Sequence, residues 1–560
     1  MPISGKLKRT LSLARDHGVR HTASRVLERQ RERRDYAKWV KRFGSLGDTD
    51  RDRIREDIKT FGAAPLISVV MPVYDVEETW LGLAVESVRR QLYPNWELCI
   101  ADDRSRSAHV RRVLTRYAEI DARIRVVFRA ENGHISAASN SALELATGEF
   151  VVLLDHDDEL TEDALYHVAR ELNTFPETEM IYSDEDTIDE KGRRYFPRFK
   201  PDFSRDLFYS VNLVTHLSAY KTTLLRELGG FRLGLEGSQD YDLALRAVER
   251  IPESGIRHIP RILYHWRAIR TSAAHSRDAK PYAYERAREA LCGHFERTGI
   301  MACVEPAVLN LNRVRYEMVD RPKIALIVFG GETPATNVQK IRDVTAYPTF
   351  EILHTGKLPA TASVLNEAAA KTGGEVLCFL NAEFLPLAGD WLEEMVSFAM
   401  QEKIGVVGAK MLDAHGTIIS AGSIIGQNGT AGPAHYSLPR ADHGNFVRAQ
   451  LVGNYSAVSG GYLVTRRAIF EAVGGFDAAN LENKLFAADY CLRLGRAGYR
   501  VAYTPYAELA RSTKKEKPDR AHTVAEEYEY FVEKWAAEIE RDPFYNPNFK
   551  NSGPSFRIKT

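Results

Sequence analysis

The chain of 560 residues is 44% hydrophobic and 27% charged, an ordinary globular composition at a length that calls for two or three domains. No apolar run approaches the roughly eighteen residues of a transmembrane helix, and the N-terminus lacks the apolar core of a signal peptide, so we expect neither feature. The five scattered cysteines have no CxxC spacing, which favours reduced thiols and a cytoplasmic location over a disulfide or zinc framework.

The formal net charge of zero hides a basic N-terminal arm, which we expect to span residues 1–62. Residues 1–47 contain 13 Lys+Arg and 4 Asp+Glu, so this stretch carries +9 and the remainder −9. Apolar residues spread through it, such as Trp39 and Phe43, predict a partly amphipathic helix. The arm suits either peripheral contact with an anionic membrane or packing on the protein itself. No recognised nucleic-acid-binding module follows it, so we expect no nucleic acid partner.

Short apolar runs alternate with helical segments in the first domain, which we place at residues 63–310. The runs LISVVMP, WELCIAD, IRVVFRA and EFVVLLD are typical of buried strands. Helical stretches between them predict an α/β fold with a Rossmann-like, mainly parallel sheet. Ligands bind such sheets beyond the carboxyl ends of the strands. The polar segments at those ends are Pro72-Val73-Tyr74, Asp102-Asp103 and Asp155-His156-Asp157-Asp158.

The segment LLDHDDEL carries the first candidate site. Asp155 and Asp157 lie one residue apart after an apolar run, where both carboxylates can reach one divalent cation, Mg²⁺ or Mn²⁺. Such a cation would bridge phosphate oxygens. Acidic loop clusters are more often simply solvated, but the position directly after VVLL favours a metal site. Asp158 is a weaker third candidate.

The segment GSQDYDLALR carries the second candidate. Asp240 and Asp242 precede an apolar helical stretch, so either could serve only as a helix cap or first-turn acid. The functional alternative makes Asp240 a general base near the metal-bound substrate.

The segment ILYHWR offers three further residues. His265 could be a third metal ligand, Trp266 a stacking wall and Arg267 an anion contact. A lone histidine is more commonly a satisfied core residue.

Weaker signals come from MIYSDEDTID and RFKPDF. Asp184 and Glu185 could border the acceptor or form a solvated turn. Lys200 could contact phosphate or acceptor as a cation.

A second, weaker copy of the pattern follows at residues 320–515, and a C-terminal helix and tail at 516–560 end the chain. GEFVVLLDHDDEL parallels GEVLCFLNAEFL, and an asparagine lies eight residues before each opening glycine. GGF with DLALR likewise parallels GGF with DYCLR, so an internal duplication is predicted. Counting from the shared glycines and arginines places Asn381, Glu383 and Ala487 where the first copy has Asp155, Asp157 and Asp240.

Together, PVYDVEETWLGLAVESVRRQLYPNWELCIADD, NGHISAASNSAL, LLDHDDELTEDAL, YSDEDTID and EGSQDYDLALR resemble family 2 glycosyltransferases of the GT-A fold. The similarity covers roughly Leu66 to Ala274 and is strongest to the branch that builds bacterial surface polysaccharides, such as O-antigen and capsule. It implies that Pro72, Tyr74, Asp102, Asp103 and Asp155 bind the nucleotide, that Asp155 and Asp157 bind the metal and diphosphate, and that Asp240 is the base. The usual Glu-Asp pair is here Gln239-Asp240, which keeps the base and changes its neighbour.

The resemblance implies an inverting, metal-dependent transfer of a sugar from a nucleoside diphosphate sugar to a glycan acceptor. A lipid-linked acceptor at the inner face of the cell membrane fits this branch. Because alanine cannot act as a base, the second copy is expected to be degenerate and the chain to hold one active site. A nucleotidyltransferase is disfavoured, because no glycine-rich phosphate loop is present. A non-catalytic scaffold in a polysaccharide assembly complex is the alternative from another class.

Overall fold

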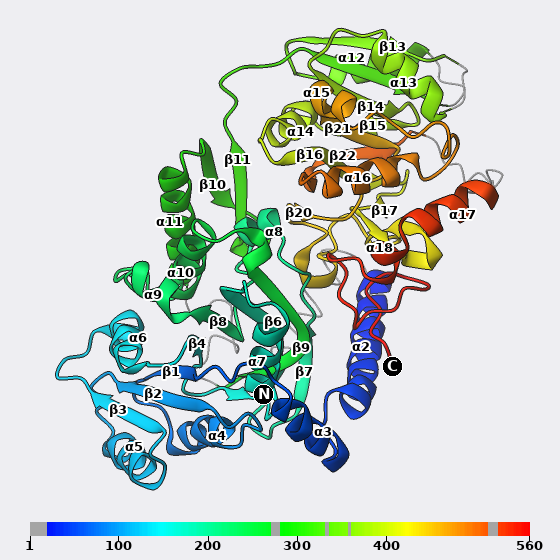
Figure 1. The fold of residues 1–560 in the computed structure, drawn as a ribbon. Helices are drawn as coiled ribbons and strands as arrows, with labels where there is room; N and C mark the ends of the chain where they lie inside the picture. The colour runs from blue at the N-terminus through cyan, green and yellow to red at the C-terminus, as the bar shows by residue number, and fades with distance from the viewer. Residues whose placement is uncertain (1–18, 270–280, 331–334, 357–359, 513–524) are drawn as a thin grey trace.

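The computed structural model describes residues 19–269, 281–330, 335–356, 360–512 and 525–560 (Figure 1). The first part of the basic arm and the charged segment TKKEKPDR lie outside the described residues. Two nine-stranded sheets follow one another along the chain and dominate the fold. They confirm the predicted α/β class with two related domains; the exact domain boundaries remain a prediction.

The first sheet begins with parallel strands and continues with mixed ones. In spatial order it contains β3 (Ile124–Phe128), β2 (Trp96–Asp102), β1 (Ile67–Val73), β4 (Phe150–Leu153), β8 (Ser218–Lys221), β6 (Met180–Ile188), β9 (Ile256–Arg267) and β5 (Glu159–Leu160), with β7 (Arg194–Arg198) on β6. Strands β3, β2, β1 and β4 are parallel neighbours, whereas β8 runs antiparallel to both β4 and β6. Strands β1 and β2 are buried along their whole length, as their mostly apolar runs predict. The carboxyl ends of β1, β2 and β4 therefore meet at one edge.

Helices cover this sheet and supply some of the site residues. They are α4 (Glu78–Arg89), α5 (Ala108–Ile120), α6 (His134–Leu145), α7 (Ala164–Thr174), α8 (Arg205–Ser210), α9 (Thr222–Glu227), α10 (Gln239–Val248) and α11 (Pro281–Thr298). A hairpin of β10 (Ala302–Pro306) and β11 (Asn312–Tyr316) leads to the second sheet.

Among the described residues, the second sheet repeats the strand order of the first and has no counterpart of β3. In order it contains β13 (Phe350–His354), β12 (Ile324–Phe329), β14 (Val376–Asn381), β21 (Tyr462–Arg466), β16 (Ile404–Leu412), β22 (Arg500–Arg511) and β15 (Phe384–Pro386), with β17 (Ile418–Ser420) on β16 and β20 (Gly453–Asn454) on β22. A separate pair joins β18 (Ser423–Ile425) to β19 (Ala431–Pro433). The helices are α12 (Ala335–Val344), α13 (Ala362–Ala370), α14 (Trp391–Ala399), α15 (Arg467–Ala472), α16 (Phe486–Arg496), α17 (Ala525–Lys534) and α18 (Ala536–Glu540).

Buried contacts join the two halves of the chain. The Asp206 carboxylate accepts hydrogen bonds from Asn454 Nδ2 at 2.6 Å and Arg500 Nε at 3.1 Å. Asn454 Oδ1 also accepts one from the Ser204 hydroxyl at 3.0 Å. One hydrophobic cluster runs through both sheets and includes Leu207 and Leu451. The two halves are therefore packed into one continuous body, and a ligand between them can contact both.

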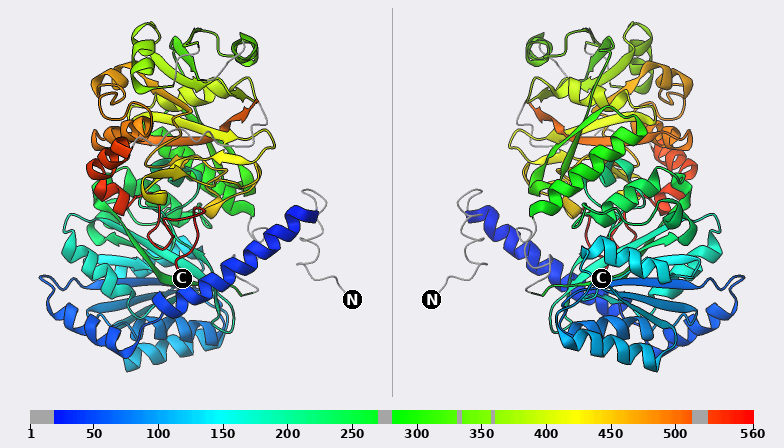
Figure 2. Two further views of the ribbon diagram at one scale, coloured as in Figure 1. Left: turned by 90° about the vertical axis from the view of Figure 1, so that its right-hand side faces the viewer. Right: turned by 90° about the vertical axis from the view of Figure 1, so that its left-hand side faces the viewer.

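The arm and the tail pack against each other on this body. The arm forms α2 (Val19–Phe43) and α3 (Asp48–Lys59), and Figure 2 shows α2 running outward toward its N-terminal end. Tyr36 and Trp39 are buried, and the Trp39 ring lies 5.1 Å from that of Phe199. Trp39 Nε1 donates a hydrogen bond to Asn548 of the tail. This end of the arm packs on the protein, and no described helix is both long and apolar enough to cross a membrane.

Candidate functional site

Backbone contacts at the ends of β1, β2 and β4 bring the predicted nucleotide residues together. Asp103 N donates to Val73 O at 2.8 Å, and Asp103 Oδ1 accepts hydrogen bonds from Gly133 N and Arg129 Nε at 2.9 Å each. His156 Nδ1 lies 3.0 Å from Pro72 O. Pro72, Tyr74 and Asp103 line one large cleft. Asp102 is buried beneath it, and its carboxylate accepts a hydrogen bond from Ser105 N.

A group of three possible metal ligands lies at the end of β4. One ligand atom from each of Asp155, Asp158 and His216 lies within 4.8 Å of the others. Burial, together with the nearby charges of Asp157 and Asp155, raises the pKa of Asp158 well above its usual range. This like-charge crowding is what a bound cation would relieve, so the donor set fits a divalent ion. Asp157 lines the same cleft without belonging to the group.

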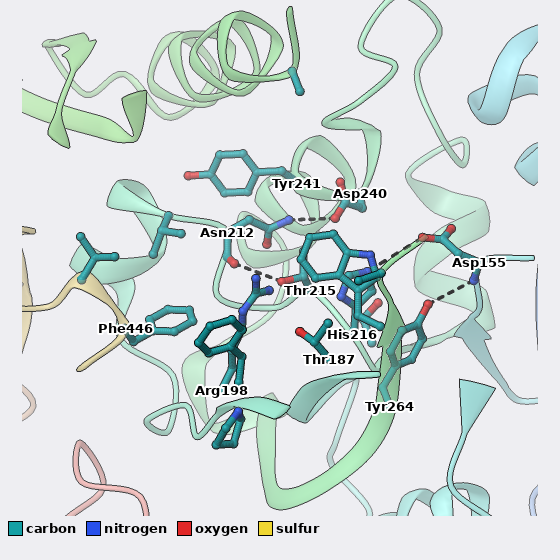
Figure 3. Close-up of a pocket in the computed structure, with 18 of the residues that line it drawn as sticks. Asp155, Thr187, Arg198, Asn212, Thr215, His216, Asp240, Tyr241, Tyr264 and Phe446 are labelled. Atoms are coloured by element: carbon teal, nitrogen blue, oxygen red, sulfur yellow. Dashed lines mark hydrogen bonds and ion pairs between the residues drawn. The ribbon is translucent and has the colours of Figure 1, made fainter. Parts of the chain in front are cut away.

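His216 is positioned by buried neighbours. Its Nδ1 lies 2.9 Å from Glu185 Oε2, and its ring stacks on Tyr264 with centroids 4.5 Å apart. Burial alone would lower the pKa of His216, but the Glu185 carboxylate outweighs it and raises that pKa. Lys200 Nζ donates to the His216 carbonyl at 2.9 Å. The Nε2 atom of His216 is then left 3.9 Å from Asp155 Oδ2 (Figure 3).

Asp184, Glu185 and Lys200, expected as acceptor or phosphate contacts, are buried below the cleft. Asp184 accepts hydrogen bonds from Lys200 N and from Asn546 of the tail, both at 2.8 Å, and contacts His258 Nε2 at 2.9 Å. Burial opposes the charge of Glu185, yet the nearby cations Lys200 and His216 hold its pKa well below its usual range. The three residues support the loop that carries His216 and do not line the cleft.

Asp240 lies in the first turn of α10 and faces the cleft, half-buried. Asn212 Nδ2 donates a hydrogen bond to Asp240 Oδ2 at 2.9 Å (Figure 3). Burial raises the pKa of Asp240 above its usual range, although His216 opposes the shift. Asp242 is instead fully buried and bound by Arg246 and Arg232, so it serves the packing of the helix.

His265 and Arg267 do not join the metal group. Neighbouring residues of a strand point to opposite faces, and Trp266 lines the cleft, so His265 points away from it. Its Nδ1 lies 2.5 Å from Asp186 Oδ1, and it lines a separate pocket next to α2. The Arg267 backbone N donates to Asp158 at 2.7 Å and its Nε to the Asp157 carbonyl at 2.9 Å. Arg267 therefore fixes the acidic loop from behind.

The structure adds residues that the sequence did not indicate. His216 precedes β8 in the segment VNLVTHLSAY, which has no recognisable ligand spacing, and Asn212 lies in the same segment. Both reach the site because β8 pairs antiparallel with β4 and brings its leading end to Asp155. The only signal in the sequence was a polar residue shortly before β8, the strand that pairs with β4.

The cleft is larger than these residues require. Its volume is about 2460 Å³, and its lining extends from β1 to the second half of the chain and to the tail. Residues 435–447 and 549–558 contribute His435, Tyr436, Leu438, Asp442, His443, Gly444, Asn445, Phe446, Val447, Phe549, Pro554, Ser555, Phe556, Arg557 and Ile558. In Figure 3, the Phe446 ring lies on the side of the cleft opposite Asp155.

Comparisons with known proteins show what this chain is similar to. The family model described as Glycosyl transferase family 2 matches residues 68–229. An uncharacterised protein of Sinorhizobium fredii is 39% identical over 94% of this chain and 63% of its own length. The O-antigen biosynthesis protein RfbC of Myxococcus xanthus is 32% identical over 88% of this chain and 41% of its own. The chain thus spans less than two thirds of either relative.

Among solved structures, S. aureus TarS in complex with UDP aligns with 41% of this chain and 65% of its own, at 17% identity and a TM-score of 0.34. That level of similarity leaves the donor and the acceptor to be argued from the cleft itself.

Proposed function

We propose that this protein transfers one sugar from a nucleoside diphosphate sugar to a hydroxyl group of a glycan, because residues 68–229 match the Glycosyl transferase family 2 model. The observation that carries the proposal is a single cleft lined by Asp240, Asp155 and His216. A base and a site for a diphosphate-bound cation in one cleft are what direct displacement at an anomeric carbon needs.

In the proposed reaction, Asp240 is the general base. The acceptor hydroxyl gives its proton to the Asp240 carboxylate as its oxygen bonds to the anomeric carbon, and the bond from that carbon to the diphosphate oxygen breaks. Attack opposite the leaving group inverts the configuration. The raised pKa makes Asp240 a stronger base than an exposed aspartate, and Asn212 fixes one carboxylate oxygen. Such a base contributes a rate factor of roughly 10²–10⁴.

Asp155, Asp158 and His216 are the residues proposed to hold a divalent cation, with Asp157 as a further candidate. An imidazole in the set favours Mn²⁺ over Mg²⁺, because Mg²⁺ prefers oxygen ligands. When bound, the cation would supply positive charge for the departing diphosphate. His216 takes the place that the sequence had suggested for His265.

The donor and acceptor ends follow from the order of residues along the cleft. We place the nucleoside near Tyr74 and Asp103, at the ends of β1 and β2. Similarity to the O-antigen biosynthesis protein of Myxococcus xanthus supports a polysaccharide of the cell surface, and hence a lipid-linked acceptor at the inner membrane face. Tyr36 and Trp39 are buried in the protein. We therefore propose that the part of the basic arm before Tyr36 makes any peripheral contact with an anionic membrane leaflet.

The second half is proposed to be non-catalytic. Asn381, Glu383 and Ala487 replace the predicted ligands and base. The two sheets also share a strand pairing: Phe150 pairs with Lys221 in the first half, and Val376 pairs with Arg466 in the second. The residue five positions before Lys221 is His216, and the residue five positions before Arg466 is Gly461. A glycine offers neither a ligand nor a proton acceptor.

Thermal unfolding of the purified protein with a panel of nucleoside diphosphate sugars and Mn²⁺ tests the proposal. Binding to the folded state raises the melting temperature. We expect one donor to stabilise the protein only when Mn²⁺ is present, and Asp155→Ala to remove that effect. A wild-type protein that no nucleotide sugar stabilises would argue against donor binding and favour the scaffold alternative.

A further inference from the structure

The second half of the chain lines the catalytic cleft of the first. The loop of residues 435–447, between β19 and β20, faces the same cavity as Asp155 and Asp240. At about 2460 Å³ the cavity exceeds the roughly 300–1,000 Å³ of ordinary small-molecule sites. A nucleotide sugar leaves most of it unfilled, so a second, longer ligand has room beside the donor.

Unusual backbone conformations concentrate around this cavity. Fourteen described non-glycine residues have positive φ, and nine of them line the cleft. In the 435–447 loop these include His435 at 59°, Phe446 at 50° and Val447 at 62°. Such conformations are costly for residues with a side chain and persist mainly where the surroundings hold them, often at binding sites. The loop therefore holds a specific conformation at the edge of the cleft.

The tail packs against the loop, and both line the cleft. The His435 ring stacks on Phe556 with centroids 4.4 Å apart, and its backbone N donates to the Ser555 hydroxyl at 3.1 Å. Gly444 packs so closely that an added Cβ would lie 2.4 Å from His435 Nδ1. Gln450 Nε2 donates to the carbonyl of Asp442 at 2.7 Å. These contacts hold the loop in place and leave the Tyr436 side chain 58% exposed.

Aromatic rings therefore line the cleft from both halves. Tyr436 and Phe446 come from the loop, and Trp266 and Phe196, the latter 55% exposed, come from the first half. A sugar ring has apolar C–H faces and a polar rim of hydroxyl groups. Flat apolar ring faces with polar groups between them match that chemistry.

We infer that the 435–447 loop is the acceptor-binding wall of the cleft, and that the acceptor is a glycan of several sugar units. Its terminal hydroxyl reaches Asp240 while the units behind it lie along Phe446 and Tyr436. This rests on the proposed transferase function of the first half. It gives the second half a role that needs none of the residues it has lost.

Glycan-binding measurements on a printed array of bacterial surface oligosaccharides test this inference. The variants are Tyr436→Ala, Phe446→Ala and the pair together, and Leu387→Ala is the matched control. Leu387 is also an exposed apolar residue of the second half, at 44%, but it does not line the cleft. The melting temperature with UDP, GDP or TDP and Mn²⁺ reports the donor end of each variant separately.

We expect the wild type to bind glycans of three or more sugars. The double variant should bind the same glycans with an affinity that is lower by about tenfold or more. Leu387→Ala should bind as the wild type does, and nucleotide stabilisation should not change in any variant. Glycan binding that is equal in the wild type and the double variant, or confined to monosaccharides, would overturn the acceptor wall. A wild type that binds nucleotide but no glycan would also overturn the acceptor wall. A wild type that nucleotide does not stabilise would instead count against the proposed function. Tyr436→Ala keeps the test valid if Phe446→Ala destabilises the fold, because Tyr436 is mostly exposed.

Discussion

The two halves of this chain share the contacts that build a fold and differ in the residues that could perform chemistry. Asn140 bridges α6 to the Phe231 backbone with two hydrogen bonds of 2.8 Å, and Asn366 does the same from α13 to Phe476 at 2.8 and 3.0 Å. At the strand end, however, Asp155 of the first half corresponds to Asn381 of the second.

The helix that carries the proposed base repeats the same pattern. Arg246 binds Asp242 and the Gly230 carbonyl, and Arg493 binds Asp489 and the Gly475 carbonyl, all between 2.6 and 2.9 Å. Two residues before each of these aspartates, the cleft-facing Asp240 of the first half corresponds to Ala487 of the second. The comparison teaches that packing residues and reacting residues are separable, even where they alternate along one helix.

The strongest way to break the comparison is to give the first half the residues of the second. Asp240→Ala removes the proposed base at the position of Ala487. We expect the turnover number for transfer to fall by about 10²–10⁴, because the acceptor hydroxyl loses its proton acceptor. Donor stabilisation by Mn²⁺ and nucleotide sugar should persist, which separates catalysis from folding. Transfer at the wild-type rate would rule out Asp240 as the base.

A second exchange, Asp155→Asn, brings the residue of position 381 into the first half. The neutral amide is a poorer ligand than a carboxylate, so we expect Mn²⁺ affinity in the presence of nucleotide to fall by roughly 10–100-fold. Titration of Mn²⁺ against transfer rate measures this. The reciprocal Asn381→Asp is the control and should create no second metal site, because Gly461 provides no imidazole. An unchanged metal dependence in Asp155→Asn would contradict the assignment.

The pH profile sharpens the role of Asp240. A base must be ionised to accept a proton, so activity rises with pH through the Asp240 pKa and then levels off. Burial moves that pKa above the ordinary aspartate value of 3.8. We therefore expect transfer to fall about tenfold per pH unit below a midpoint higher than 3.8. Activity that stays level down to pH 3.8, in a protein still folded by circular dichroism, would be inconsistent with this environment.

The packing contacts should respond equally in both halves. Asn140→Ala and Asn366→Ala each leave a backbone N–H and a carbonyl without their partner, which costs about 1–3 kcal/mol in the free energy of unfolding. Urea denaturation measures the loss. A large effect in one half and none in the other would show that the bridges are not equivalent.

Much of the site was predictable because it follows from strand ends. The runs before Pro72, Asp102 and Asp155 are mostly apolar, and parallel neighbours bring their carboxyl ends together. Side chains alternate between the two faces of a strand, but the sequence of one strand does not show which face meets the cleft. For this reason the sequence pointed to His265, whereas in the structure Trp266 faces the cleft. His216 required knowledge of an antiparallel pairing that no spacing encodes.

The sequence indicated Trp266 as a stacking wall, but the part of the acceptor side that the second half contributes could not be predicted. Phe446 lies 206 residues after Asp240 in the chain, in a segment without motif or periodicity. Its place in the cleft depends on how the two halves pack through contacts such as Asp206 with Arg500. Contacts of this range leave no trace in local patterns.

Calorimetric titration of the wild-type protein with its stabilising nucleotide and Mn²⁺ tests the central claim most directly, because it counts sites. One nucleotide per chain, bound more weakly in Asp155→Asn and unchanged in Asn381→Ala, is the predicted result. Two nucleotides per chain, or one that survives Asp155→Asn and disappears in Asn381→Ala, would contradict a single catalytic centre in the first half.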